Sequence, residues 1–130
     1  MPIEYRIDHE HRVVLAQGKG AFTIEDMIKY QTEAWSQPGV SGYNELVDMS
    51  DVTEIVDPNV EDIRRIVKLS VSMDSPDAHA RMAIAAPNKL MFGLGRMYEA
   101  YRELQPQSTK IVRVFKTVRE AMDFLGLPSE

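Results

Sequence analysis

The most conspicuous residues that could carry out chemistry in this sequence form a series of five carboxylates spaced three residues apart. They are Glu45, Asp48, Asp51, Glu54 and Asp57. Two carboxylates can act as acid and base, or hold a divalent cation, when their side chains converge. Side chains alternate along a strand, so Glu45 and Asp48 would point to opposite faces of the strand expected here. Asp57 is expected to cap a helix, and the series therefore does not predict a catalytic pair.

Asp48 is the most site-like of these carboxylates, because it ends an apolar strand close to a predicted helix start. In open α/β sheets, ligands bind beyond the carboxyl ends of parallel strands. The candidate ligand or partner site at this edge consists of Asp48, Ser50, Asp57, Asn88 and Lys89. The alternative role for Asp48 is to accept backbone N–H groups and hold the turn that follows it.

Other familiar catalytic patterns are not found in the sequence. His9 and His11 flank Glu10 at a predicted hairpin turn, with no third metal ligand in view, so we expect solvated turn histidines. The chain has no cysteine, which excludes thiolate zinc sites, disulfides and a cysteine nucleophile. No serine stands in a nucleophile-elbow pattern, and the glycine pairs lack the context of a nucleotide-binding loop. We therefore expect no enzyme, no metal and no cofactor.

The charge balance also restricts the choice of partners. Fifteen basic and twenty acidic residues give a net charge of −5, which does not suit a nucleic-acid backbone. No apolar run approaches the roughly 20 residues that a membrane-spanning helix needs. The first residues alternate like a strand and lack the apolar core of a signal peptide. We expect a soluble, cytoplasmic protein.

Hydrophobic periodicity predicts an alternation of strands and helices after a front hairpin. This is an α/β fold with a single mixed β-sheet of about five strands and four helices, in one domain over residues 1–130. Asp57 is expected to cap the second helix with Pro58 in its first turn, and Thr23, Asn88 and Thr117 to cap the others. Strands are expected at 3–7, 12–17, 43–49 (extended or bulged over 52–55), 82–86 and 110–115, and helices at 24–36, 58–73, 89–104 and 118–125.

Two helices carry features that suggest an interface. The apolar stripe of helix 58–73 covers about half its circumference, so the surplus either packs a neighbouring helix or meets a second subunit. In helix 89–104, Phe92 should project with the charged residues, while Leu90 and Leu104 belong to the buried stripe. The candidate interface comprises Leu69, Met73, Phe92 and Arg96. In the first helix, Gln31 falls inside the apolar stripe, either as a satisfied buried amide or with a functional role.

Several short motifs resemble a known family. The stretch from Asp48 to Asp57 resembles the strand-to-helix junction of the STAS domain, the fold of bacterial anti-sigma-factor antagonists. The chain is more similar still to small stand-alone bacterial SpoIIAA-like proteins, through the segments 44–48, 86–87 and 92–97. This resemblance implies a STAS-like fold that binds a protein partner. Antagonists of that family carry a phosphorylated Ser or Thr directly after the aspartate, where this chain has Pro58, so the usual phospho-switch is not expected.

Three functional hypotheses follow. The first is a non-enzymatic STAS-like regulatory module that binds a protein partner and forms a homodimer through helices 58–73 and 89–104. The alternative is a carrier of a small molecule or lipid, with an apolar pocket between sheet and helices of at least ~300 Å³. Trp35, Met91, Tyr98 and Tyr101 would line that pocket. The third is an enzyme in which Asp48 is the acid or base, and this requires polar groups that converge on it.

Overall fold

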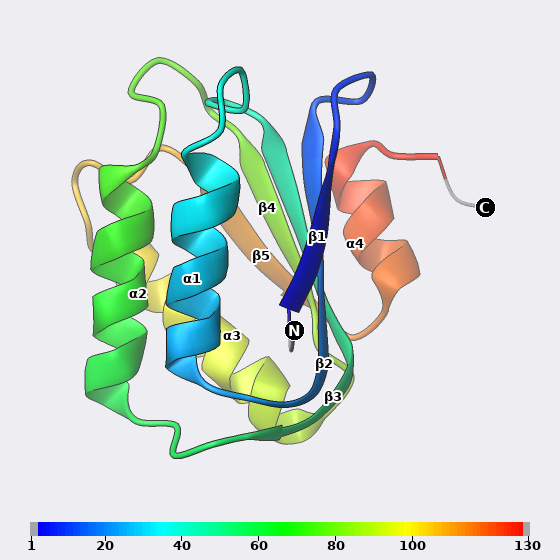
Figure 1. The fold of residues 1–130 in the computed structure, drawn as a ribbon, viewed down its shortest axis with the longest axis vertical. Helices are drawn as coiled ribbons and strands as arrows, with labels where there is room; N and C mark the ends of the chain where they lie inside the picture. Colours follow the sequence, from blue (N-terminus) through cyan, green and yellow to red (C-terminus); the bar gives the residue numbers. More distant parts are fainter. Residues whose placement is uncertain (1–2, 129–130) are drawn as a thin grey trace.

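Five strands form one sheet in which they lie in sequence order, β1-β2-β3-β4-β5 (Figure 1). The computed structural model describes residues 3–128. β1 pairs antiparallel with β2, and the other neighbours are parallel, so the predicted mixed sheet is confirmed. The elements are β1 (Ile3–Asp8), β2 (Val13–Phe22), α1 (Ile24–Trp35), β3 (Asn44–Ile55), α2 (Val60–Ser72), β4 (Arg81–Ala85), α3 (Lys89–Glu103), β5 (Ile111–Phe115) and α4 (Val118–Leu125).

The helices are distributed unequally over the two faces of the sheet. α1, α2 and α3 lie side by side on one face, and α4 lies on the other (Figure 1). Three successive parallel crossovers of one hand place all three connecting helices on the same face. The larger apolar core lies beneath α1–α3, and a smaller core lies between α4 and the strands β2–β5. In the described part of the chain, no helix is long and apolar enough to cross a membrane.

β3 is longer than the pattern of apolar residues predicted. It continues through Asp48 to Ile55 and pairs with β2 along most of its length. The pairing shifts register between Gln17 and Lys19, so this part of the ladder is bulged. Asp48 therefore lies within β3, but level with Ala85, the last residue of β4.

The predicted start of α2 was wrong by two residues. Asn59, not Asp57, caps the helix, and its Oδ1 accepts a hydrogen bond from the Asp62 backbone N–H at 2.9 Å. Asn59 Nδ2 in turn donates to the Asp62 carboxylate at 2.9 Å. Both Asp57 and Asn59 are favourable capping residues, but only Asn59 places an acidic side chain at the third helical position. Asp57 adopts a left-handed backbone with φ 48°.

The buried stripe of α3 also differs from the apolar pattern. Its buried residues are Met91, Gly95, Tyr98 and Arg102, which recur at helical spacing. Two of these four were hidden from a hydrophobicity pattern, because one lacks a side chain and the other is charged. Leu90 and Leu104, predicted to be buried, are 53% and 73% exposed.

Candidate functional site

A groove lies on the sheet face that α4 covers only in part. α4 packs against β3, β4 and β5, and Val13 at the start of β2 is buried in the same core. Within residues 3–128, the surface of β1 and of the rest of β2 on this side has no covering helix (Figure 1). The groove has a volume of about 890 Å³. Its apolar lining consists of Val13, Leu15, Leu46, Val118, Met122 and Leu127, and its polar lining includes Glu4, Arg6, Asp8, His11, Gln17, Asp48 and Arg119.

The strand register explains why these residues meet. Arg6 lies opposite Leu15, and Leu15 opposite Leu46, so the three side chains form one row across the sheet. In the next row, Gln17 lies between Glu4 and Asp48. Successive side chains of a strand point to opposite faces, so Arg6, Leu15 and Leu46 share this face while their neighbours along each strand point to the larger core.

Asp48 lies in this groove, but its environment is not that of a catalytic acid or base. Its Oδ1 accepts a hydrogen bond from the Ser50 backbone N–H at 2.9 Å, the turn-holding role considered as the alternative. Gln17, which is level with Asp48, donates to Asp51 at 2.9 Å. Among the described residues, no other side chain hydrogen-bonds to Asp48, and polar groups do not converge on it.

The other predicted site residues do not gather around Asp48. Ser50 is exposed two residues further along β3. Asp57, Asn88 and Lys89 are exposed at the starts of α2 and α3, on the opposite face of the sheet from the groove. Asn88 caps α3 as predicted, with its Oδ1 accepting from the Leu90 backbone N–H at 2.8 Å. The structure thus separates the predicted cluster into a groove residue and helix-start residues.

The candidate interface residues lie mostly against the core. Leu69, Met73 and Phe92 are half-buried and pack on the larger core, so the prediction that Phe92 projects into solvent was wrong. Only Arg96 is exposed, with its Nε 3.9 Å from a Glu99 carboxylate oxygen. α2 lies between α1 and α3 and contacts both, which accounts for its wide apolar stripe within the monomer.

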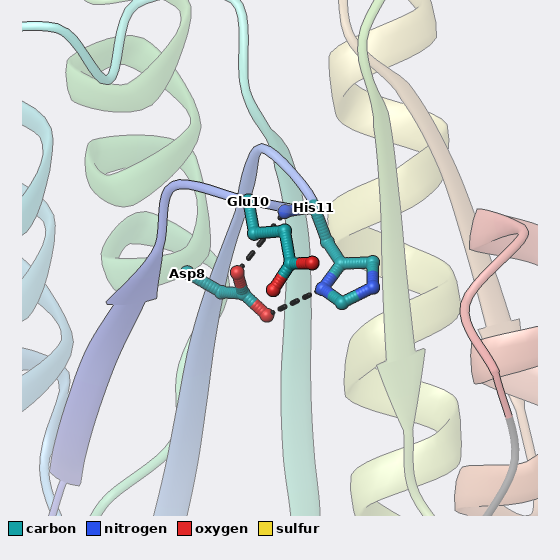
Figure 2. A group of neighbouring side chains, drawn as sticks. All are labelled: Asp8, Glu10 and His11. Atoms are coloured by element: carbon teal, nitrogen blue, oxygen red, sulfur yellow. Dashed lines mark hydrogen bonds and ion pairs between the residues drawn. The ribbon is translucent and has the colours of Figure 1, made fainter.

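The front hairpin brings three potential metal ligands together. One ligand atom each from Asp8, Glu10 and His11 lies within 4.8 Å of the others (Figure 2). The Asp8 carboxylate is already engaged, since it accepts from the His11 backbone N–H at 3.0 Å and contacts His11 Nδ1 at 2.8 Å. These contacts lower the pKa of Asp8 and raise the pKa of His11. His9 turns away to the Tyr43 hydroxyl, so the two histidines do not form a site together.

A small cavity lies on the other face, between the sheet and α1–α3. Its volume is about 80 Å³, well below the ~300 Å³ expected for the pocket of a carrier. Met91 and Tyr98 line it as anticipated, but Trp35 and Tyr101 do not. This conformation cannot enclose a lipid chain.

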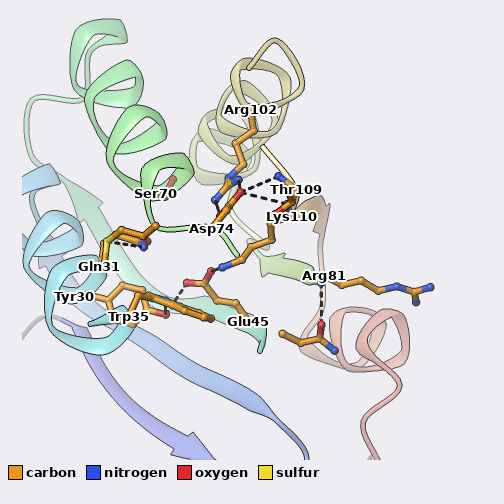
Figure 3. A network of polar contacts seen from close by, with 12 residues as sticks. Tyr30, Gln31, Trp35, Glu45, Ser70, Asp74, Arg81, Arg102, Thr109 and Lys110 are labelled. Carbon is orange, nitrogen blue, oxygen red and sulfur yellow. Dashed lines mark hydrogen bonds and ion pairs between the residues drawn. The ribbon is translucent and has the colours of Figure 1, made fainter. Parts of the chain in front are cut away.

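Two buried ion pairs were missed by the sequence patterns (Figure 3). One joins the carboxyl ends of α2 and α3, and the other joins the start of β3 to the residue before β5. Arg102 pairs with Asp74 at 2.7 Å, and Lys110 pairs with Glu45 at 3.0 Å. The Tyr30 hydroxyl also donates to Glu45 at 2.6 Å. Burial is the main reason why the pKa of Tyr30 is raised, and the charge of the Glu45 carboxylate is the second. The available signals were Glu45 in an otherwise apolar strand and Arg102 four residues after Tyr98 on the buried stripe. The charges in this network are matched, as buried charges require.

Comparison with known proteins gives a fold but no function. No protein-family model matches the chain, and no curated protein matches it. Among solved structures, it is similar to an uncharacterized protein from the DUF3478 family with a SpoIIAA-like fold from Shewanella loihica PV-4. The match covers 95% of this chain and 93% of that chain, with a TM-score of 0.57 and 17% sequence identity. The chain therefore has the SpoIIAA-like α/β fold that its motifs predicted.

Proposed function

We propose that this protein is a non-enzymatic binding module whose groove beside α4 accepts an amphipathic helix of a partner protein. The observation that carries the proposal is the part of the sheet over β1 and β2 that α4 leaves uncovered. There the half-buried side chains of Leu15, Met122 and Leu127 lie between charged rims. This proposal places the partner contact on the opposite face of the sheet from α2 and α3, because the apolar residues of these two helices pack within the monomer.

The dimensions of the groove suit one helix. Adjacent strands are about 4.8 Å apart, so the distance from β1 to β3 is roughly 10 Å, the diameter of a helix. α4 shows what such packing requires, since it places Ala121 and Leu125 against the neighbouring strands.

Two arginines on the rims favour acidic residues on the flanks of the partner helix, although the carboxylates of Glu4, Asp8 and Asp48 also line the groove. Glu4 is paired with Lys19 and Asp8 with His11, at 3.3 and 2.8 Å. Arg6 on β1 and Arg119 on α4 form no ion pair with any described residue. A helix with a leucine stripe and glutamates on both flanks would bury the apolar floor and meet both guanidinium groups.

A designed peptide of this kind provides the test. We expect it to bind with amide chemical-shift changes in β1, β2 and α4, and a peptide with lysine in place of glutamate to bind at least tenfold more weakly. Leu15→Glu should abolish binding, whereas Leu104→Glu on exposed α3 surface should leave it unchanged. Shift changes confined to α2 and α3, or wild-type binding by Leu15→Glu, would contradict the proposal. Self-association through the groove would contradict the proposal as well. It would appear as a dimer mass together with concentration-dependent chemical-shift changes in β1.

A further inference from the structure

The small cavity under α1–α3 contains one polar group whose hydrogen-bonding capacity is not used. Gln31 lines this cavity and is only 5% exposed. Its Nε2 donates to the Met73 sulfur at 3.6 Å, and a thioether is a weak acceptor. Its carbonyl oxygen, Oε1, accepts no hydrogen bond from any described residue. A largely buried amide with one weak hydrogen bond costs free energy, and a ligand that pairs with its oxygen would offset that cost.

The unpaired oxygen is not sealed from molecules the size of water. None of the described side-chain nitrogen or oxygen atoms is both inaccessible to water and unpaired. Gln31 Oε1, which has no partner, must therefore keep some accessible surface, and the cavity is the space that Gln31 lines. The other polar side chains at this end are occupied: Glu45 binds Tyr30 and Lys110, and the Tyr98 hydroxyl contacts Ser70 and Arg102.

The rest of the lining is apolar and adaptable. Met27, Met49, Met82 and Met91 contribute four of its side chains, and methionine reshapes readily around a ligand. The cavity of about 80 Å³ is roughly half the size of a 150 Å³ cavity that can hold benzene. A short chain can therefore enter only if methionine side chains move aside to enlarge the cavity.

From these observations we infer that the cavity binds a small neutral molecule with a short apolar body and an amide or hydroxyl group that pairs with Gln31. No lysine or arginine lines the cavity, while Glu45 does, so a carboxylate ligand would have no cation to meet. A primary amide both donates to Oε1 and accepts from Nε2, which makes it the best complement. The site is independent of the groove, which lies on the opposite face of the sheet.

Hexanamide is the probe for this inference, and hexanoate is its charged counterpart. With methyl-labelled methionine, we expect hexanamide to shift the signals of the cavity methionines in a saturable way, and hexanoate to bind at least tenfold more weakly. Leu94→Trp, which narrows the cavity from α3, should weaken hexanamide binding at least tenfold. Leu90→Trp, on an exposed position of the same helix, should leave binding unchanged.

Gln31→Leu tests whether binding needs the Gln31 amide or only the empty space of the cavity. This test does not depend on whether Leu94→Trp folds. We expect this variant to keep its thermal stability, because it removes a poorly paired buried amide, and to bind hexanamide about tenfold more weakly. The inference is wrong if hexanamide produces no saturable shift up to its solubility. It is also wrong if hexanoate binds equally well, or if Gln31→Leu binds hexanamide like the wild type.

Discussion

The pair formed by Asp74 and Arg102 shows how a small core holds two charges at the scale of single residues. Arg102 is 1% exposed and donates to both carboxylate oxygens of Asp74, at 2.7 and 2.9 Å. The backbone N–H of Thr109 also donates to Asp74, at 3.0 Å. Burial alone would raise the pKa of Asp74, but the hydrogen bonds and charge of Arg102 outweigh it, so the pKa is lowered.

Removing the charge of Asp74 should strongly destabilise the protein. In Asp74→Asn the guanidinium of Arg102 stays buried without its counter-ion, so we expect the free energy of unfolding to fall by about 3 to 5 kcal/mol. Urea unfolding at pH 7 measures this. Asp77→Asn changes an exposed residue of the same linker and should have almost no effect. A loss below 1 kcal/mol in Asp74→Asn would show that the pair does not hold α3 to the linker.

The same pair gives the pH dependence a definite sign. The pKa of Asp74 is lower in the folded than in the unfolded protein. Its contribution to the free energy of unfolding is therefore complete above the unfolded pKa, and it is lost as the pH falls through the folded pKa. Wild-type stability should therefore decline below about pH 4, and Asp74→Asn should show a flatter decline. Sequence patterns could not predict this pair, because Arg102 and Asp74 are 28 residues apart.

At the scale of elements, the start of α2 offers a direct test of which residue caps it. Asn59→Ala removes the side-chain acceptor for Asp62 N–H, and we expect a loss of about 1 kcal/mol in the free energy of unfolding. Asp57→Gly should be neutral or slightly stabilising, because Asp57 has a left-handed backbone that glycine adopts without strain. If thermal and urea unfolding showed a larger loss for Asp57→Gly than for Asn59→Ala, Asp57 would be the residue that caps α2.

Two glycines in α3 should respond oppositely to the same substitution. A Cβ at Gly95 would lie 3.2 Å from both methyl groups of Val114, so Gly95→Ala should push α3 from the sheet and cost about 1 to 3 kcal/mol. A Cβ at Gly93 would meet no atom within 4 Å, so Gly93→Ala should stabilise the exposed helix surface by up to about 1 kcal/mol. Chemical denaturation of the two variants measures both signs, and equal effects would contradict this packing of α3.

Over the whole molecule, local patterns predicted the order of elements better than they predicted the site. Alternating strands and helices imply one sheet with parallel crossovers, and the apolar β3 and β4 imply interior strands. The groove depends instead on how far α4 extends over the sheet, and nothing in its sequence from Val118 to Leu125 says which strands it covers. Asp48 was a candidate because it ends an apolar run, whereas the sequence patterns singled out none of Arg6, Leu15 and Arg119, which also line the groove.

The pair formed by Glu45 and Lys110 joins parts of the molecule that are distant in sequence, and its coupling can be measured. Lys110 precedes β5, Glu45 lies in β3, and the ammonium of Lys110 also lies 3.7 Å from the ring centroid of Trp35 at the end of α1. Lys110→Met leaves Glu45 buried without a cation, and we expect a loss of about 3 to 5 kcal/mol in the free energy of unfolding.

Adding Glu45→Gln to Lys110→Met removes the stranded charge and should restore part of this loss, with a coupling energy of about 1 to 3 kcal/mol. Trp35 is the only tryptophan in the chain, so its fluorescence follows both the unfolding and the loss of the nearby ammonium. Arg64→Met, which removes an exposed cation over the Tyr101 ring, is the matched control and should change stability by less than about 1 kcal/mol. Strictly additive effects of the two core substitutions would mean that β3 and the start of β5 are held together by apolar packing alone.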